Sequence, residues 1–124
     1  MKYIILFFLT ITINAYSQND KRVLGKTFAE NELKLALSIK SQHNFVDNKR
    51  IIIKDSLTAI NIAEQILFSN YGKDIIENEK PYETYLIDNY WIIAGTLPKG
   101  WKGGTFLIII DARNSKVLKI THGK

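Results

Sequence analysis

The stretch that decides the fold is YWIIAGTLPKGWKGGTFLIIIDARNSKVLKITH, residues 90–122. It consists of β-branched and aromatic runs that are separated by glycine-rich or Asn-Ser segments, which is the pattern of strands joined by turns. One more run precedes it, and the pair Asp88-Asn89 between them is typical of a turn. The sequence therefore predicts a four-stranded antiparallel meander, with strands at 82–87, 90–97, 105–111 and 116–121.

A helix is predicted immediately before the meander. Asp55 or Ser56 can cap its first turn, and Gly72 supplies the left-handed stop. Apolar residues recur between these two points at helical spacing, namely Ala59, Ile62, Ala63, Ile66 and Leu67. One side of this helix is thus expected to pack on the sheet.

A further helix and a short strand are predicted nearer the N-terminus. Thr27 and Glu30 have the spacing of a capping box, and the helix would continue to about Ser41. Its expected buried side consists of Leu33, Ala36, Leu37 and Ile39. Residues 50–54 are β-branched enough to predict a short strand.

Helices packed on an antiparallel meander define an α+β fold of the cystatin-like or roll type. The central strands are apolar on both sides, whereas a half-exposed strand alternates between apolar and polar residues. Both faces of the sheet therefore need cover. The helix at 56–71 can cover one face; the first helix, a second copy of the chain in a homodimer, or another partner could cover the other.

The N-terminus has the features of a secretory signal peptide. Lys2 precedes an apolar run at residues 3–9, and Ala15-Tyr16-Ser17 places small residues where signal peptidase cleaves. The run is too short to span a bilayer, so no stable membrane anchor is expected after cleavage. We predict a signal peptide at 1–17, an N-terminal segment at 18–54, a main domain at 55–124, and a periplasmic or secreted location.

Composition adds two constraints. The chain has 17 basic and 12 acidic residues, a net charge of +5, which favours acidic partners and gives nucleic acid little support. It has no cysteine, so an exported domain must fold without disulfides.

No metal or cofactor site is predicted from the sequence. Gly25-Lys26-Thr27 resembles the end of a phosphate-binding loop, but Asp20 stands where that loop requires glycine. His43 and His122 are the two histidines, and their spacing does not match that of metal ligands. His122 is interpreted as a residue at the rim of the sheet with an ordinary hydrogen bond.

No catalytic residue is predicted either. Ser115, His122 and Asp111 could be imagined as a triad, but Ser115 lies in a turn where serine is common. The carboxylates at Glu77, Glu79 and Glu83 are interpreted as a solvated acidic edge, because nothing around them would raise a carboxyl pKa.

The loop between the second and third strands is the best candidate for a binding element. Trp101 stands between Lys99 and Lys102 and is flanked by glycines. Such a tryptophan can dock in an acidic pocket of a partner, or it can fold back over the sheet as a lid. Tyr82 and Tyr85 add aromatic surface that is assigned to the same partner-binding site, with cross-strand packing as the alternative.

The second half of the chain resembles the nuclear-transport-factor-two (NTF-two) fold immunity proteins of bacterial polymorphic toxin systems. The resemblance is carried by residues from Ala59 to Lys124, most specifically by the element Gly95-Thr96-Leu97-Pro98-Lys99-Gly100 followed by Gly103-Gly104. It also includes residues 59–67, Tyr71-Gly72-Lys73, Lys80-Pro81-Tyr82, Trp91, Lys116-Val117-Leu118 and His122-Gly123-Lys124.

This resemblance implies an NTF-two-like fold with a curved sheet and a non-enzymatic protein that binds and neutralises a cognate toxin in bacterial competition. Together with the signal peptide, it predicts an immunity protein that acts in the periplasm and meets a toxin with an acidic surface or cleft. Two other classes stay open. One is a periplasmic peptidase inhibitor or pro-peptide-like module, and the other is an enzyme or small-ligand binder of the same broad fold.

Overall fold

The computed structural model of the chain describes residues 21–38 and 44–123, in two compact units at 1–41 and 42–124. Each unit is considered by itself. The predicted signal peptide and His43 lie outside the described residues. No helix of the described ranges is long and apolar enough to cross a membrane.

The first unit contains α1, Lys26–Leu37. The predicted capping box is wrong: Gly25 precedes the helix with φ 86°, and no side chain caps the first turn. The helix begins two residues earlier than the box requires, and Glu30 instead pairs with Lys26 one turn before it, at 3.6 Å. Among the described residues of its own unit, α1 buries none of its side chains, so the expected buried side finds no partner there.

The second unit contains two consecutive helices, α2 at Ser56–Tyr71 and α3 at Lys73–Glu77. Asp55 caps α2 as predicted, since its carboxylate accepts from the backbone amide of Thr58 at 2.8 Å. Gly72 ends the helix with φ 93°. The side chains of Ala59, Ala63 and Leu67 are buried, and those of Ile62 and Ile66 are half-buried.

The sheet is the predicted meander, with four antiparallel strands in the order β1-β2-β3-β4. At the first turn Asp88 and Asn89 have φ of 47° and 68°, as in the type I′ turns that favour these residues. The second strand ends at Ala94, three residues early, because the amide of Thr96 donates to the Glu79 carbonyl at 2.8 Å. The strands are β1 at Glu83–Ile87, β2 at Tyr90–Ala94, β3 at Phe106–Asp111 and β4 at Val117–His122.

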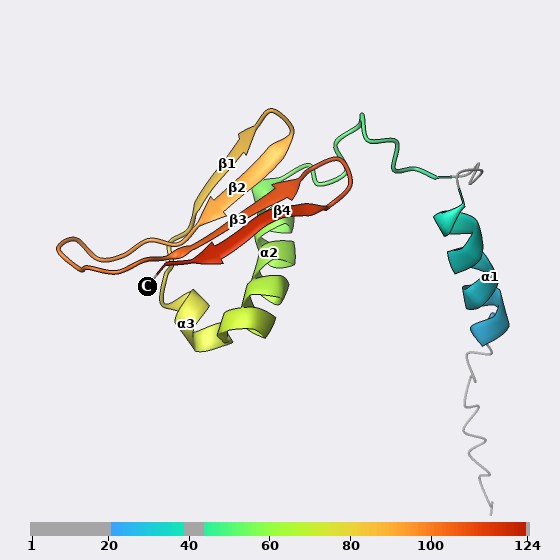
Figure 1. Cartoon of the computed structure of the whole chain (residues 1–124), viewed down its shortest axis with the longest axis horizontal. Helices are drawn as coiled ribbons and strands as arrows, with labels where there is room; N and C mark the ends of the chain where they lie inside the picture. Colours follow the sequence, from blue (N-terminus) through green and yellow to red (C-terminus); the bar gives the residue numbers. More distant parts are fainter. Residues whose placement is uncertain (1–20, 39–43, 124) are drawn as a thin grey trace, which may run out of the picture. The chain divides into compact units, whose positions relative to one another are not determined.

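The hydrophobic core lies between the helices and one face of this sheet (Figure 1). Phe106, Ile108 and Ile110 alternate along β3 toward α2, and each has no exposed surface. The remaining core side chains come from every other element of the unit except the edge strands: Ile53, Ala59, Ala63, Leu67, Ile76, Trp91, Ile93 and Ala112. Apolar side chains thus fill the space between helix and sheet.

Residues 50–54 do not form the predicted strand. The amides of Ile52 and Ile53 both donate to one carbonyl, that of Ala112, at 2.8 and 3.0 Å. Ile53 is buried, and its own carbonyl accepts from the indole of Trp91 at 2.9 Å. The β-branched residues therefore pack into the core without pairing as a strand. A high β propensity reflects how well a side chain packs more than a preference of its backbone for the strand conformation.

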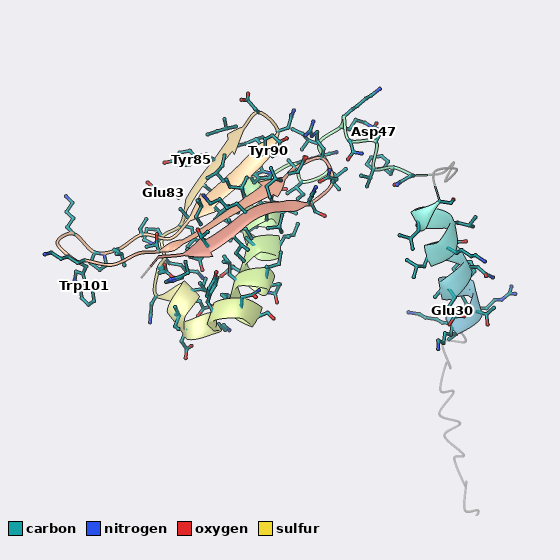
Figure 2. The ribbon with its side chains drawn as sticks, in the orientation of Figure 1. Glu30, Asp47, Glu83, Tyr85, Tyr90 and Trp101 are labelled. Atoms are coloured by element: carbon teal, nitrogen blue, oxygen red, sulfur yellow. The ribbon has the colours of Figure 1, made fainter. Side chains whose placement is uncertain are left out.

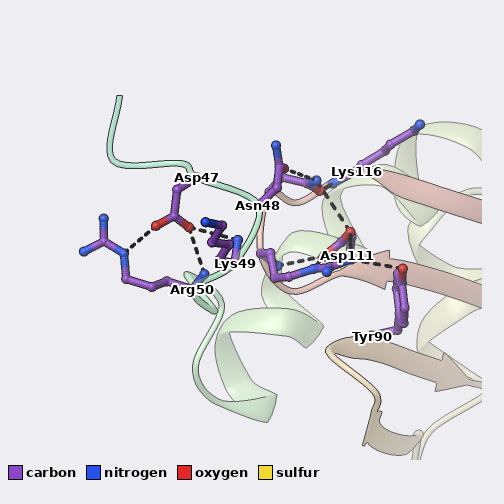
Figure 3. A network of polar contacts seen from close by, with 9 residues as sticks. Asp47, Asn48, Lys49, Arg50, Tyr90, Asp111 and Lys116 are labelled. Carbon is purple, nitrogen blue, oxygen red and sulfur yellow. Dashed lines mark hydrogen bonds and ion pairs between the residues drawn. The ribbon is translucent and has the colours of Figure 1, made fainter. Parts of the chain in front are cut away.

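A polar network holds this segment beside the turn between β3 and β4 (Figure 3). Asn114 donates to the side-chain oxygen of Asn48 at 2.8 Å. Asp111 accepts from Arg113, whose guanidinium also donates to the Tyr90 hydroxyl at 3.0 Å. These hydrogen bonds from Arg113 outweigh burial and hold the pKa of Asp111 below its usual range. The carboxylate of Asp111 therefore fastens the turn between β3 and β4.

The other face of the sheet has no helix on it within this unit. It carries three cross-strand rows of side chains: Ile87–Tyr90–Asp111, Tyr85–Ile92–Ile109–Lys119 and Glu83–Ala94–Leu107–Thr121. The expectation that both faces are apolar is confirmed for β2 and β3, but only one face is covered by the second unit. We call these three rows the open face.

Candidate functional site

The loop between β2 and β3 projects beyond the end of the sheet (Figure 1). Trp101 lies near its tip and points away from the sheet (Figure 2), with 71% of its surface exposed. Lys99 and Lys102 on either side are exposed as well. In the structure Trp101 is therefore not a lid over the core of its own protein.

Two glycines fix the base of this loop. Gly104 and Gly123 approach so closely that a Cβ on Gly104 would lie 2.1 Å from the Cα of Gly123. The amide of Gly123 also donates to the carbonyl of Thr105 at 3.1 Å. Gly104 and Gly123 thus allow the two backbones to touch where the loop re-enters the sheet.

The side chain of Glu79 contacts three segments at the base of this loop. Its Oε1 accepts from the backbone amide of Phe106 at 2.8 Å, and its Oε2 lies 3.0 Å from Nε2 of His122. Gly95 packs on it, because a Cβ there would lie 2.7 Å from Cβ of Glu79. The start of β3, the end of β4 and the start of the loop therefore meet on one buried carboxylate, which is 5% exposed.

This position corrects the interpretation of Glu79 as part of a solvated acidic edge, although Glu83 is exposed as expected. Glu79 lies two residues beyond the end of α3, and it is buried through contacts with Phe106 and His122, so its charge and its local spacing gave no signal for burial.

The environment of His122 favours its charged form. Nδ1 lies 2.8 Å from the carbonyl of Gly123 and Nε2 lies 3.0 Å from Glu79, and both partners are acceptors. Only an imidazolium can donate from both nitrogens. Burial alone would lower the pKa of His122, but the hydrogen bonds to Glu79 and Gly123 and the charge of Glu79 outweigh it and raise the pKa above 6.5.

A pH dependence of stability follows from this pair. Because the folded pKa of His122 is raised, its contribution is fully present below about pH 6.5 and is lost as the pH rises through the folded value. We expect the melting temperature to fall by a few degrees between pH 6 and pH 8.5 in the wild type, and by less in His122→Gln. His43 is present in both proteins, so it is not what distinguishes them in the comparison. Equal slopes for the two proteins would contradict the assignment.

The two tyrosines that the sequence assigned to the same surface lie on different faces. Tyr85 belongs to the open face and is 52% exposed (Figure 2). Tyr82 lies on the helix side, where its hydroxyl donates to Glu64 at 3.1 Å and its ring meets Phe106 edge-on at 5.1 Å. A single flat partner surface therefore cannot contact Tyr82 together with Tyr85.

Tyr82 lines a shallow groove of about 550 Å³ between α2 and the start of β1. Burial and the hydrogen bond to Glu64 raise the pKa of Tyr82 well above its usual range, so the phenol stays protonated. Glu64 also pairs with Lys80 at 3.6 Å. The carboxylate of Glu64 is thus paired with both Tyr82 and Lys80. Its other lining residues are Leu57, Ile60, Asn61 and Pro81.

The structure does not assemble the imagined triad. Asp111 is bound by Arg113, Ser115 occupies a turn with φ 61°, and His122 contacts Glu79. Within residues 21–38 and 44–123, no three His, Asp or Glu side chains are close enough together to hold a metal ion.

The geometry defines a small α+β protein with an open sheet and an exposed aromatic and basic loop. The chain belongs to the NTF2 fold immunity protein family, whose family model matches residues 58–124, more than half of the chain and the part that includes α2, the sheet and the loop. The resemblance seen in the sequence and the predicted α+β fold class are thereby confirmed.

Two relatives come from Escherichia coli strain K12. The uncharacterised protein YhhH is 30% identical over 95 residues, which are 76% of this chain and 73% of YhhH. The uncharacterised protein YbbC is 28% identical over 125 residues, which are 100% of both chains. No solved structure gives a significant match.

Proposed function

We propose that this chain is an immunity protein that binds and neutralises a cognate toxin of a bacterial polymorphic toxin system. Membership of the immunity protein family supports toxin neutralisation as the general role. The observation that carries the specific proposal is Trp101, which is 71% exposed on a loop whose base is fixed by the Gly104–Gly123 contact and Glu79.

The loop has the physical features of a stoichiometric inhibitor. A large aromatic side chain that is exposed in the free protein gains most when a partner's pocket removes it from water. Lys99 and Lys102 would steer it toward an acidic surface or cleft and raise the rate of association. Binding alone blocks the toxin in this mechanism, so the protein needs no catalytic residue.

The predicted signal peptide at residues 1–17 supports action in the periplasm. A toxin met there would attack peptidoglycan, periplasmic proteins or the membrane. Protection should therefore depend on the compartment in which the immunity protein is present.

Protection of cells tests the proposal directly. We expect the cognate toxin to be encoded next to this gene. A toxin domain found there would be expressed with an export signal in a sensitive strain, together with either the full chain or a variant that lacks residues 2–17. We expect growth to be rescued by the full chain only. Rescue by both variants would contradict the periplasmic location, and rescue by neither would contradict toxin neutralisation.

A further inference from the structure

The open face of the sheet is an apolar surface that the second unit leaves without a helix. In its middle row, Tyr85, Ile92 and Ile109 lie side by side on β1, β2 and β3. Tyr85 is 52% exposed, and Ile92 and Ile109 are half-buried only by their neighbours on the same face. A contiguous apolar patch of this kind marks an interaction site.

Basic side chains lie at the β4 edge of this patch and on the loop beyond its end. Lys119 ends the middle row on β4, and the next row, which ends in Ala94 and Leu107, leads into the loop that carries Lys99 and Lys102. Two carboxylates lie in the three rows: Glu83 is exposed, and Asp111 is paired with Arg113 at 2.9 Å. The open face is thus apolar in its middle row, and exposed lysines lie at its β4 edge and on the loop beyond its end.

We infer that the open face binds the same toxin as the loop, and that the toxin presents an apolar patch bordered by carboxylates to it. The inference rests on the proposed function. Four strands of five or six residues cover roughly 350 Å² at the usual strand spacing, which is under half of the roughly 800 Å² per partner in a stable complex. A partner that contacts both the face and the projecting loop can reach that size.

A second copy of the chain fits this surface less well. A symmetric pair joined through the face and the loop would bring Lys99, Lys102 and Lys119 of both copies into one interface, and the chain already carries a net charge of +5. Like charges brought together cost binding energy, and a net charge far from zero keeps chains apart. An acidic toxin surface satisfies the same lysines.

Charge substitutions at Tyr85 test the assignment, with Ile75 as the matched control. Ile75 is 54% exposed, nearly the same as Tyr85, but lies on α3 on the other side of the sheet. The purified toxin domain that the protection experiment identifies would be titrated calorimetrically with the wild type, Tyr85→Glu, Tyr85→Lys, Ile75→Glu and Trp101→Ala. Melting temperatures and sedimentation of each variant alone would be measured alongside, and Tyr85→Ser replaces Tyr85→Glu if the charge lowers stability.

We expect Tyr85→Glu to weaken toxin binding about tenfold or more, Tyr85→Lys to weaken it less, and Ile75→Glu to leave it within about twofold. Unchanged binding by Tyr85→Glu while Trp101→Ala loses affinity would overturn this inference and leave the proposed function standing. Absence of binding by the wild type would instead overturn the proposed function and this inference with it. A wild-type dimer that Tyr85→Glu converts to monomer would assign the face to a second copy.

Discussion

Replacing Glu79 with alanine is expected to lower the free energy of unfolding by about 3 kcal/mol, which is a large part of the stability of a small domain. The substitution removes the acceptor of the buried Phe106 amide and leaves His122 without its carboxylate. An unsatisfied buried donor costs about 1 to 3 kcal/mol, and breaking a buried ion pair adds to that. Chemical denaturation of the two proteins at pH 6 measures the difference directly.

Two controls separate the parts of this effect. Glu79→Gln keeps an oxygen for the Phe106 amide but removes the charge that faces His122, so it should cost about 1 to 2 kcal/mol. Combined with His122→Gln, it should cost less than the sum of the single substitutions, since both remove the same pair. A loss below about 1 kcal/mol for Glu79→Ala would show that the carboxylate does not hold the three segments together.

The meander and its turns could be predicted from the sequence because local signals determine them. Asp88 and Asn89 adopt the positive φ for which these residues are suited, and the aromatic and β-branched run at 106–111 forms β3. The helix at Ser56–Tyr71 follows equally from its cap and its apolar spacing. These features need no knowledge of distant contacts.

Features that depend on distant contacts could not be predicted in the same way. Glu79 is buried because Phe106 and His122, which are 27 and 43 residues away in the chain, meet it. Ile53 is held in the core by a hydrogen bond from the indole of Trp91 to its carbonyl, and it does not pair with a neighbouring strand. The charge of Glu79 predicts exposure and the β propensity of Ile53 predicts a strand. At both residues the contacts with distant parts of the chain decided otherwise.

In the candidate site, too, some features could be predicted from the sequence and others could not. Trp101 with its lysines stands out locally, and the loop is exposed as a binding element should be. Tyr82 and Tyr85 are three residues apart, so alternation along the predicted strand at 82–87 already separates them, and the assignment of both to one surface overlooked this. The apolar content of β2 and β3 did indicate that a second face needs cover, but the lysine at the edge of that face became visible only once Lys119 was placed in the row of Tyr85.

Replacing Trp101 with alanine is expected to weaken toxin binding by about 2 kcal/mol or more, roughly thirtyfold, and to leave the melting temperature unchanged. The side chain is 71% exposed in the free protein, so its removal opens no cavity in the core. In the complex it would fill a pocket of the partner, and truncation would forfeit that contact. Calorimetric titration with the toxin domain and thermal unfolding of the free chain measure the two quantities separately.

Substitutions at the neighbouring lysines provide the comparison that identifies Trp101 as an anchor. Replacing Lys99 and Lys102 together with alanine should lower the association rate and weaken its dependence on salt, and should affect dissociation less, since exposed charges act mainly on encounter. Trp101→Ala should instead raise the dissociation rate, because a buried aromatic contact is lost only after docking. If Trp101→Ala lowered the melting temperature and left affinity unchanged, the indole would pack on its own protein in solution and the loop would not be the binding element.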